Sequence, residues 1–227
     1  MDAETPEAAE LNLPQAFLLL ATNDKDGEPD VPQAVLNAGL AGAVLAELDL
    51  LGAIELQGKH VRATGAAPQT DFQQQLELIR EKSRPLTPKR WVSLLESRAE
   101  LRRVYEGMAA LGIVEHVGER RLGLFKTTRY PEKDHAPEAA LLEKIRTVIH
   151  GGVSGPGTSD GGMSPSVATD PRITALVGLL YSAELLGKVF PGADQGRARE
   201  LAHGHWPSRA VADELRMIRL AEVEAAT

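Results

Sequence analysis

Apolar residues recur along most of this chain with helical spacing, and only two short stretches alternate as strands do. The pattern predicts helices in residues 11–23, 34–52, 69–85, 86–112, 137–149, 171–190 and 208–226. We expect the fourth to break near Ser97 and the sixth near Gly187. Residues 53–65 and 113–125 each predict a pair of short strands after a helix that ends at glycine. The fold class is therefore mainly α with small β-hairpins.

The composition agrees with such a fold. The chain has 227 residues, 43% of them hydrophobic and only 4% aromatic, so leucine, alanine and valine must fill the core. The acidic start, residues 1–10, is predicted to be a disordered tail, and the Gly/Ser/Pro-rich residues 151–169 a flexible loop. No stretch approaches the roughly 18 apolar residues of a membrane span, and residues 1–10 lack the features of a signal peptide. We expect a cytoplasmic protein.

The sequence offers little catalytic or metal-binding chemistry. It has no cysteine, which excludes disulfides, thiol catalysis and cysteine-based zinc sites. The glycines of residues 151–162 lack the GK[ST] ending of a P-loop. His203 and His205 point to different faces of a helix, and no further ligand accompanies them. We therefore expect a protein that is not an enzyme and has neither cofactor nor metal.

Charge is distributed unevenly. Residues 80–133 carry 13 Arg and Lys against 7 Asp and Glu, a net charge of +6 in a chain whose net charge is −7. A basic middle within an acidic body can attract an anionic partner to one surface. The alternative is a solvated face neutralised by neighbouring acids, and composition alone leaves both open.

Basic residues gather on the predicted helices before the second hairpin. Leu101, Val104, Tyr105 and Met108 form an apolar stripe, and Arg98 and Arg102 stack along its edge. A pair of guanidinium groups can bind phosphate oxygens, although pairing with Glu100 or Glu106 would also explain them. The candidate anion-binding residues are Arg98, Arg102, Arg103, Lys89 and Arg90.

The second hairpin combines apolar arms with a charged tip. We expect Gly118, Glu119, Arg120 and Arg121 to form the turn. The arms supply the candidate membrane or oligomer contacts Ile113, Val114, Val117, Leu122, Leu124 and Phe125. Apolar surface beside basic charge is typical of contacts with a membrane or with a second subunit.

Five blocks of this sequence resemble the Golgi phosphoprotein 3 family in order and spacing. They are LNLPQAFLLLATNDKDGEP, NAGLAGAVLAELDLLGAIEL, WVSLLES, LGIVEHVGERRLGLFKTTRYP and ALVGLLYSAELLGKVF. The resemblance covers residues 11–222 and implies one mainly helical domain with a projecting hairpin. Eukaryotic members are peripheral Golgi proteins that bind phosphatidylinositol 4-phosphate and retain glycosyltransferases by their cytosolic tails. The family also has bacterial members, and this chain resembles those.

The resemblance also implies a lipid site. Of the residues that bind the head group in the family, a tryptophan aligns with Pro32, an arginine with Ala41, and two helix arginines with Arg98 and Leu101. Arg102 and Arg103, beside the last position, could substitute. We expect a peripheral membrane protein that binds anionic phospholipid, acts as an adaptor for client proteins, and forms homo-oligomers through its hairpin. The alternatives are a winged-helix-like DNA-binding regulator, made less favourable by the acidic chain, and an oligomeric scaffold without lipid affinity.

Overall fold

The computed structural model describes residues 11–121, 125–150 and 170–225. The predicted tail 1–10, the predicted loop 151–169, and Leu122 and Leu124 of the hairpin lie outside the described residues. Within them the expected mainly helical class is confirmed, with ten helices and two two-stranded antiparallel sheets.

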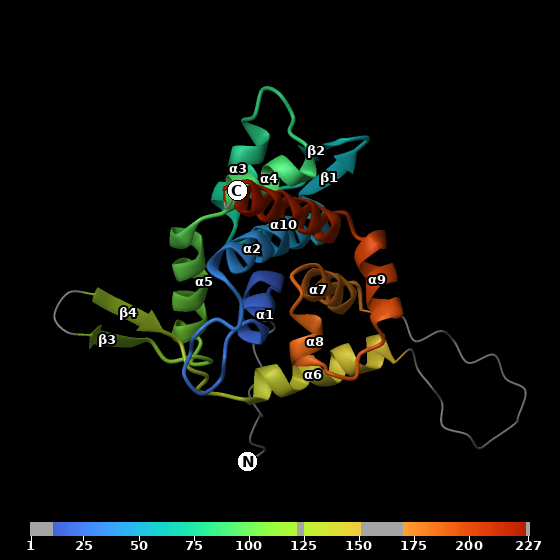
Figure 1. Cartoon of the computed structure of the whole chain (residues 1–227). Coiled ribbons are helices and arrows are strands. Elements are labelled where there is room, and N and C mark those ends of the chain that lie inside the picture. Colours follow the sequence, from blue (N-terminus) through green and yellow to red (C-terminus); the bar gives the residue numbers. More distant parts are fainter. Residues whose placement is uncertain (1–10, 122–124, 151–169, 226–227) are drawn as a thin grey trace, which may run out of the picture.

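The first helix, α1 (Leu13–Leu20), is the most deeply buried. All eight of its residues are buried, and Asn12 and Gln15 form a capping box at its start. A helix that is apolar on every side has to be surrounded by other elements. Figure 1 shows it enclosed by four helices, which are α2 (Gln33–Leu50), α5 (Arg98–Ala110), α6 (Ala136–Ile149) and α7 (Pro171–Ser182).

A buried carboxylate joins three of these helices. Glu47 of α2 is only 5% exposed. Its Oε2 atom accepts a hydrogen bond from the Leu13 backbone N–H at 2.8 Å, and Nη1 of Arg172 donates to the same oxygen at 2.5 Å. The Glu47 side chain thereby fixes the start of α1 against α2 and α7. The expectation that no stretch approaches a membrane span was wrong in length and composition, because α2 passes both criteria, although 67% of it is buried inside the protein.

The first predicted hairpin is confirmed. Strands β1 (Ile54–Gln57) and β2 (His60–Ala63) pair antiparallel, and Gly52 between α2 and β1 has φ of +66°. Helices α3 (Gln73–Arg80) and α4 (Pro88–Leu95) follow. The N-cap residue of α3 is Phe72, and no side chain caps the helix. The expected break at Ser97 is confirmed, because its hydroxyl caps α5 by accepting from the Glu100 N–H.

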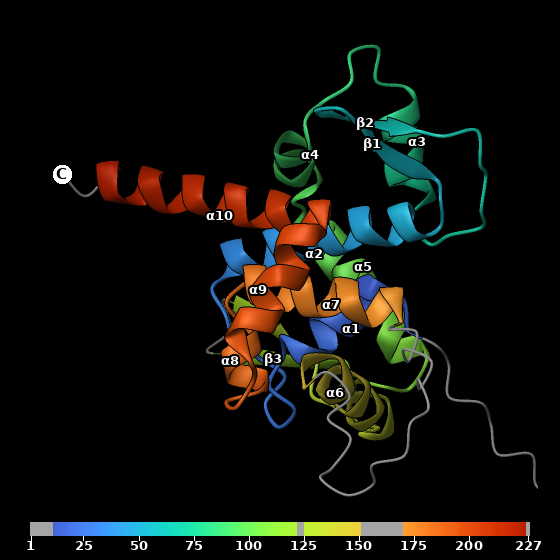
Figure 2. The same cartoon turned by 90° about the vertical axis from the view of Figure 1, so that its right-hand side faces the viewer.

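The C-terminal part differs more from expectation. Residues 171–190 break at 183–185, before Gly187, where Glu184 takes a left-handed backbone conformation with φ of 58°. The short helix α8 (Leu186–Val189) follows, and then α9 (Gln195–Gly204), which the sequence pattern did not indicate. The last helix, α10 (Trp206–Ala225), packs on the core with its first half and extends beyond it with its second (Figure 2).

The second hairpin projects from the body of the protein (Figure 1). Strands β3 (Val117–Arg121) and β4 (Phe125–Arg129) pair antiparallel from Val117↔Arg129 to Arg121↔Phe125. The predicted turn was wrong, because Gly118–Arg121 belong to β3 and the chain reverses beyond Arg121.

The predicted arms began too early. Ile113 and Val114 are each only 3% exposed and belong to the core, because Val114 pairs with Glu132 below the hairpin. These two side chains are therefore not available to a membrane or to another subunit. Val117 is half-buried at the base of the hairpin, and of Phe125 the structure describes the backbone pairing alone.

Glu96, at the end of α4, provides a test of the packing of α10. Its Oε1 atom is buried without a hydrogen-bond partner among the described residues. Burial, and then the negative charge of Glu214 on α10, raise the pKa of Glu96 to about 7. The folded protein therefore binds the Glu96 proton more tightly than the unfolded chain does. This contribution to the free energy of unfolding is fully present below about pH 4.5 and is lost as the pH rises to about 7, because the folded protein must then bury the charged carboxylate.

We predict that Glu96→Gln raises the free energy of unfolding by about 1–2 kcal/mol at pH 8 and by much less at pH 5. Urea titrations at the two pH values measure this difference. Glu222→Gln, on the exposed end of α10, is the matched control and should change neither value. Equal effects of Glu96→Gln at both pH values would contradict the proposed environment.

Candidate functional site

A pocket of about 460 Å³ lies where the hairpin leaves the body. Its walls come from the loop between α1 and α2, from one side of α5, and from the end of β4. The lining residues are Gly27, Glu28, Pro29, Val31, Gln33, Arg98, Leu101, Arg102, Tyr105, Thr128, Arg129 and Tyr130. Three segments that are distant in sequence thus meet around one cavity.

Three arginines line this pocket. Arg98 and Arg102 lie one helical turn apart on α5, as the sequence predicted, and both are exposed. Neither has a hydrogen bond or an ion pair with another described residue. Arg129 enters from β4 and forms an ion pair with Glu28 at 2.7 Å. The pocket therefore carries more positive than negative charge, and two of its guanidinium groups can bind an anion without breaking an existing pair.

Two stacked tyrosines form the inner wall. The rings of Tyr105 and Tyr130 lie parallel with centroids 4.3 Å apart, which joins α5 to the residue after β4. The Tyr105 hydroxyl lies 2.6 Å from Thr22 Oγ1, which donates its own proton to the Leu18 carbonyl at 2.6 Å. Tyr105 is therefore the donor to Thr22. Burial raises the pKa of Tyr105 to about 12, so it remains protonated at neutral pH.

Tyr130 differs from Tyr105 in one respect. Its hydroxyl is buried and has no hydrogen-bond partner in the described part of the chain. Burial, and then the charge of Glu106, raise the pKa of Tyr130, while the charge of Arg102 lowers it. Tyr130 therefore contributes its ring to the pocket beside Arg102, while its protonated hydroxyl stays buried.

Gly27 holds the loop of the pocket against the base of the hairpin. Its φ is +68°, and a Cβ atom there would lie 2.3 Å from the Pro131 nitrogen and 2.5 Å from the Tyr130 backbone. Its carbonyl accepts a hydrogen bond from the Tyr130 N–H at 3.2 Å. Only glycine permits this approach, so the DKDGEP turn is the structural reason that loop and hairpin share one pocket.

The other predicted basic residues lie elsewhere. Arg103 forms an ion pair with Glu100 and lies over the Phe72 ring at 5.2 Å from its centroid, so it is directed away from the pocket. Lys89 and Arg90 lie in the first turn of α4 and do not line the pocket. The structure thus brings together Arg98 and Arg102 of the predicted set and separates the other three.

The positions implied by the family resemblance divide in the same way. Leu101 lines the pocket, and Pro32 lies between its lining residues Val31 and Gln33. Ala41 is buried, with 2% exposure, inside α2. The sequence reasoning missed Arg129, Tyr130 and Gly27. A basic residue and an aromatic at the end of a strand, and a glycine in a turn, were the only signals of them.

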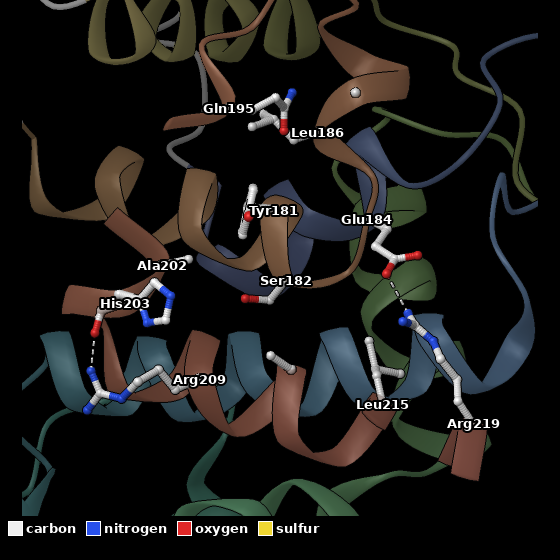
Figure 3. A pocket seen from close by; sticks show the side chains of 12 residues that line it. Tyr181, Ser182, Glu184, Leu186, Gln195, Ala202, His203, Arg209, Leu215 and Arg219 are labelled. Carbon is white, nitrogen blue, oxygen red and sulfur yellow. Dashed lines mark hydrogen bonds and ion pairs between the residues drawn. The ribbon is translucent and has the colours of Figure 1, made fainter. Parts of the chain in front are cut away.

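A second cavity, of about 470 Å³, lies between the break after α7, α9 and α10 (Figure 3). Its charged groups already have partners, because Arg219 pairs with Glu184 at 2.7 Å and Arg209 donates to the His203 carbonyl. His205, at the end of α9, is turned to Ser208, 2.7 Å away, and burial lowers its pKa to about 4. The pocket at the hairpin base is therefore the better candidate for binding an anion, because its Arg98 and Arg102 have no partner among the described residues.

The comparison with known protein families agrees with the resemblance seen in the sequence. The family model described as Golgi phosphoprotein 3 (GPP34) matches residues 13–218 of the chain. The match includes every lining residue of the pocket at the hairpin base.

The two stacked tyrosines give a matched pair of variants. We predict that Tyr105→Phe lowers the free energy of unfolding by about 1 kcal/mol, because Thr22 loses its donor. Tyr130→Phe should leave stability unchanged or slightly higher, since it removes a hydroxyl that has no partner. Urea denaturation followed by circular dichroism measures both. A loss from Tyr130→Phe as large as that from Tyr105→Phe would show that its hydroxyl is bonded within the protein.

Proposed function

The chain belongs to the Golgi phosphoprotein 3 family, and from that premise we propose that it is a peripheral membrane protein whose hairpin-base pocket binds anionic phospholipid head groups. The role is one of binding rather than catalysis. Reversible association with a cytoplasmic membrane face would place the pocket on the lipid and leave the rest of the surface for client proteins, as expected of an adaptor.

The observation that carries this proposal is the set of donors in the pocket. Arg98 and Arg102 line the pocket, are exposed, and have no partner among the described residues. Guanidinium groups bind phosphate oxygens in pairs. A phosphate-bearing head group would supply acceptors for both.

The hairpin supports the same proposal. Its strands carry Arg120, Arg121, Lys126 and Arg129 against the single acid Glu119, and Leu122 and Leu124 lie between them in sequence. Each basic residue near an anionic leaflet contributes about 1 kcal/mol of attraction, so a few of them suffice for reversible docking. Because Arg129 belongs both to β4 and to the pocket, a membrane that meets the hairpin would also meet the pocket.

We propose that this chain is less specific for its lipid head group than the eukaryotic family members are. Pro32, Ala41 and Leu101 stand where the resemblance implies a tryptophan and two arginines, so those contacts to phosphatidylinositol 4-phosphate are missing. Arg102 and Arg129 provide positive charge from other positions. We therefore propose binding to anionic head groups that bear phosphate, with weaker discrimination among them.

Removal of the two free arginines tests the pocket directly. We predict that Arg98→Ala with Arg102→Ala weakens binding to vesicles containing anionic lipid by about 10- to 30-fold, from about 1 kcal/mol for each charge. Both side chains are exposed, so the fold should persist. Vesicle flotation over a lipid titration, with neutral vesicles beside it, measures the change.

The matched control is Lys89→Ala with Arg90→Ala, which removes the same charge from the basic segment outside the pocket. This double variant should bind within about twofold of the wild type. If both double variants lose affinity equally, general charge and not the pocket binds the lipid. If neither loses affinity, the proposal is wrong, and a gel shift with duplex DNA and light scattering would then test the regulator and scaffold alternatives.

A shortened hairpin separates the two parts of the membrane contact. Replacing residues 119–127 by Asn-Gly keeps the pairs Val117↔Arg129 and Gly118↔Thr128, and so leaves the pocket complete. We predict an unchanged thermal unfolding midpoint and weaker flotation with anionic vesicles, because three basic residues and the apolar residues Leu122, Leu124 and Phe125 are lost. Light scattering on the same variant shows whether the hairpin also joins subunits. If the variant floats as well as the wild type, the pocket alone accounts for membrane binding, and a role for the hairpin is contradicted.

A further inference from the structure

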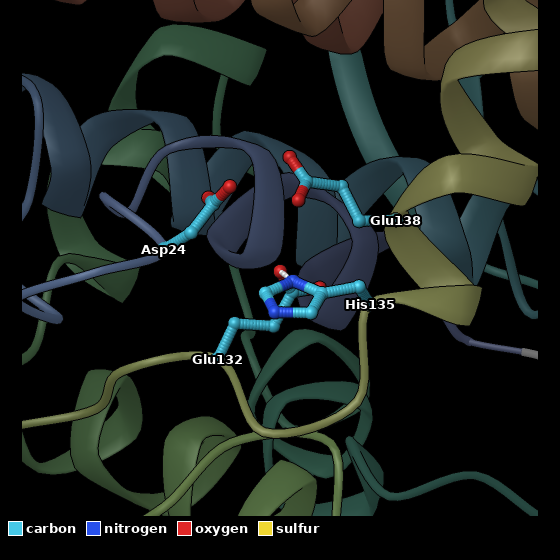
Figure 4. Close-up of side chains that lie close together, drawn as sticks. All are labelled: Asp24, Glu132, His135 and Glu138. Atoms are coloured by element: carbon cyan, nitrogen blue, oxygen red, sulfur yellow. Dashed lines mark hydrogen bonds and ion pairs between the residues drawn. The ribbon is translucent and has the colours of Figure 1, made fainter.

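Four ligand-type side chains meet beside the Gly27 loop, and none of them lines the pocket. Asp24 lies in the loop after α1, Glu132 follows β4, His135 is the N-cap residue of α6, and Glu138 lies in its first turn. One potential ligand atom from each lies within 4.8 Å of the other three. Figure 4 shows Asp24 and Glu138 reaching toward each other across a small space, with His135 and Glu132 beneath.

Glu132 is the residue that needs a partner. Its side chain is only 2% exposed, although it carries a carboxylate. Its Oε2 atom accepts a hydrogen bond from His135 Nδ1, but its Oε1 atom is buried with no hydrogen-bond partner among the described residues. A buried carboxylate oxygen without a donor is costly unless a proton or a cation occupies the adjoining space.

The neighbours increase this cost. The carboxylates of Asp24 and Glu138 belong to the same cluster as that of Glu132, so like charges lie close together around it. Three carboxylates therefore converge on one imidazole, and positive charge is deficient at their centre.

The backbone holds this arrangement in place. The Glu132 N–H donates to the Asp24 carbonyl at 3.0 Å, which fixes the two segments side by side. The Ala136 N–H donates to Asp134 Oδ1 at 3.0 Å and so holds the start of α6. His135 and Glu138 are three residues apart there, close to one helical turn, and so lie on the same side of the helix. Ligands held by hydrogen-bonded segments lose little entropy when they bind an ion.

We propose that Asp24, Glu132, His135 and Glu138 together bind one divalent transition-metal ion. Carboxylate oxygens with an imidazole nitrogen are a donor set that suits Zn²⁺ or Mn²⁺, whereas Ca²⁺ and Mg²⁺ are bound by oxygen alone. The ion would balance the carboxylates and give Glu132 Oε1 the partner that it lacks. In sequence the ligands are a lone aspartate and the spacing E-x-x-H-x-x-E, which overlaps the start of a helix.

The site would brace the pocket, though it does not depend on lipid binding. Asp24 shares its loop with the pocket residue Gly27, and Glu132 lies two residues after the pocket residue Tyr130. A bound ion would tie that loop to the base of the hairpin and to α6. Hydrogen exchange in residues 23–28 and 130–138 should therefore become slower when the ion is added.

The test titrates metal-free full-length protein with ZnCl₂ and MnCl₂ by isothermal calorimetry, with MgCl₂ and CaCl₂ for comparison. We expect one ion per chain and an affinity at least about tenfold higher for Zn²⁺ or Mn²⁺ than for Mg²⁺ or Ca²⁺. Glu138→Gln should weaken binding by about tenfold or more. Glu143→Gln, the same change on the same helix outside the cluster, should bind as the wild type does.

A second variant keeps the test decisive if Glu138→Gln is poorly folded. The His135 side chain is 71% exposed, so His135→Ala should leave the fold intact and weaken binding by a similar factor. The proposal is overturned if the wild type shows no saturable binding of one ion, or if His135→Ala and Glu138→Gln bind as tightly as Glu143→Gln. Adventitious binding at surface histidines or carboxylates would give the latter result.

Discussion

The complete burial of α1 is the constraint from which the rest of the architecture follows. Eight residues without an exposed position require neighbours on every side, and α2, α5, α6 and α7 supply them. The start of this helix is held by a buried carboxylate, because Glu47 bonds both the Leu13 N–H and Arg172. Loss of either partner would leave a charge or a donor unsatisfied in the core, which costs several kcal/mol. The helices around α1 are thus fixed in position by packing and by one polar link.

The same constraint brings the functional elements together. The chain leaves α1 at Thr22 and must turn outward past α5, where Thr22 meets the Tyr105 hydroxyl. The loop that follows contacts the base of the hairpin at Gly27 and Tyr130, and the chain then enters α6. One face of this junction is the basic pocket and another is the acidic cluster. Positive and negative groups are therefore separated by only a few residues of loop, and a change in one could shift the other.

Much of the fold could be predicted from the sequence, since helical periodicity, capping residues and the glycines after α2 and α5 are local signals. Arg98 and Arg102 could be predicted as a pair because their spacing is that of one helical turn. The errors concern features that depend on long-range pairing. Ile113 and Val114 look like a strand arm, but the bridge to Glu132 draws them into the core. Arg129, Tyr130 and the cluster around Glu132 become visible only when the loop, β4 and α6 are placed side by side.

Hydrogen exchange of the wild-type protein with and without anionic vesicles tests the central claim most directly, because it reports which backbone segments meet the membrane. The account predicts slower exchange in residues 27–33, in 98–105 and in the hairpin strands 117–121 and 125–129, with neutral vesicles giving no change. Residues 88–95, and the backbone around the cavity between α7, α9 and α10, should exchange as in the free protein. If vesicles slow exchange only in residues 88–95 or around that cavity, and not at the hairpin base, the assignment of the pocket is contradicted.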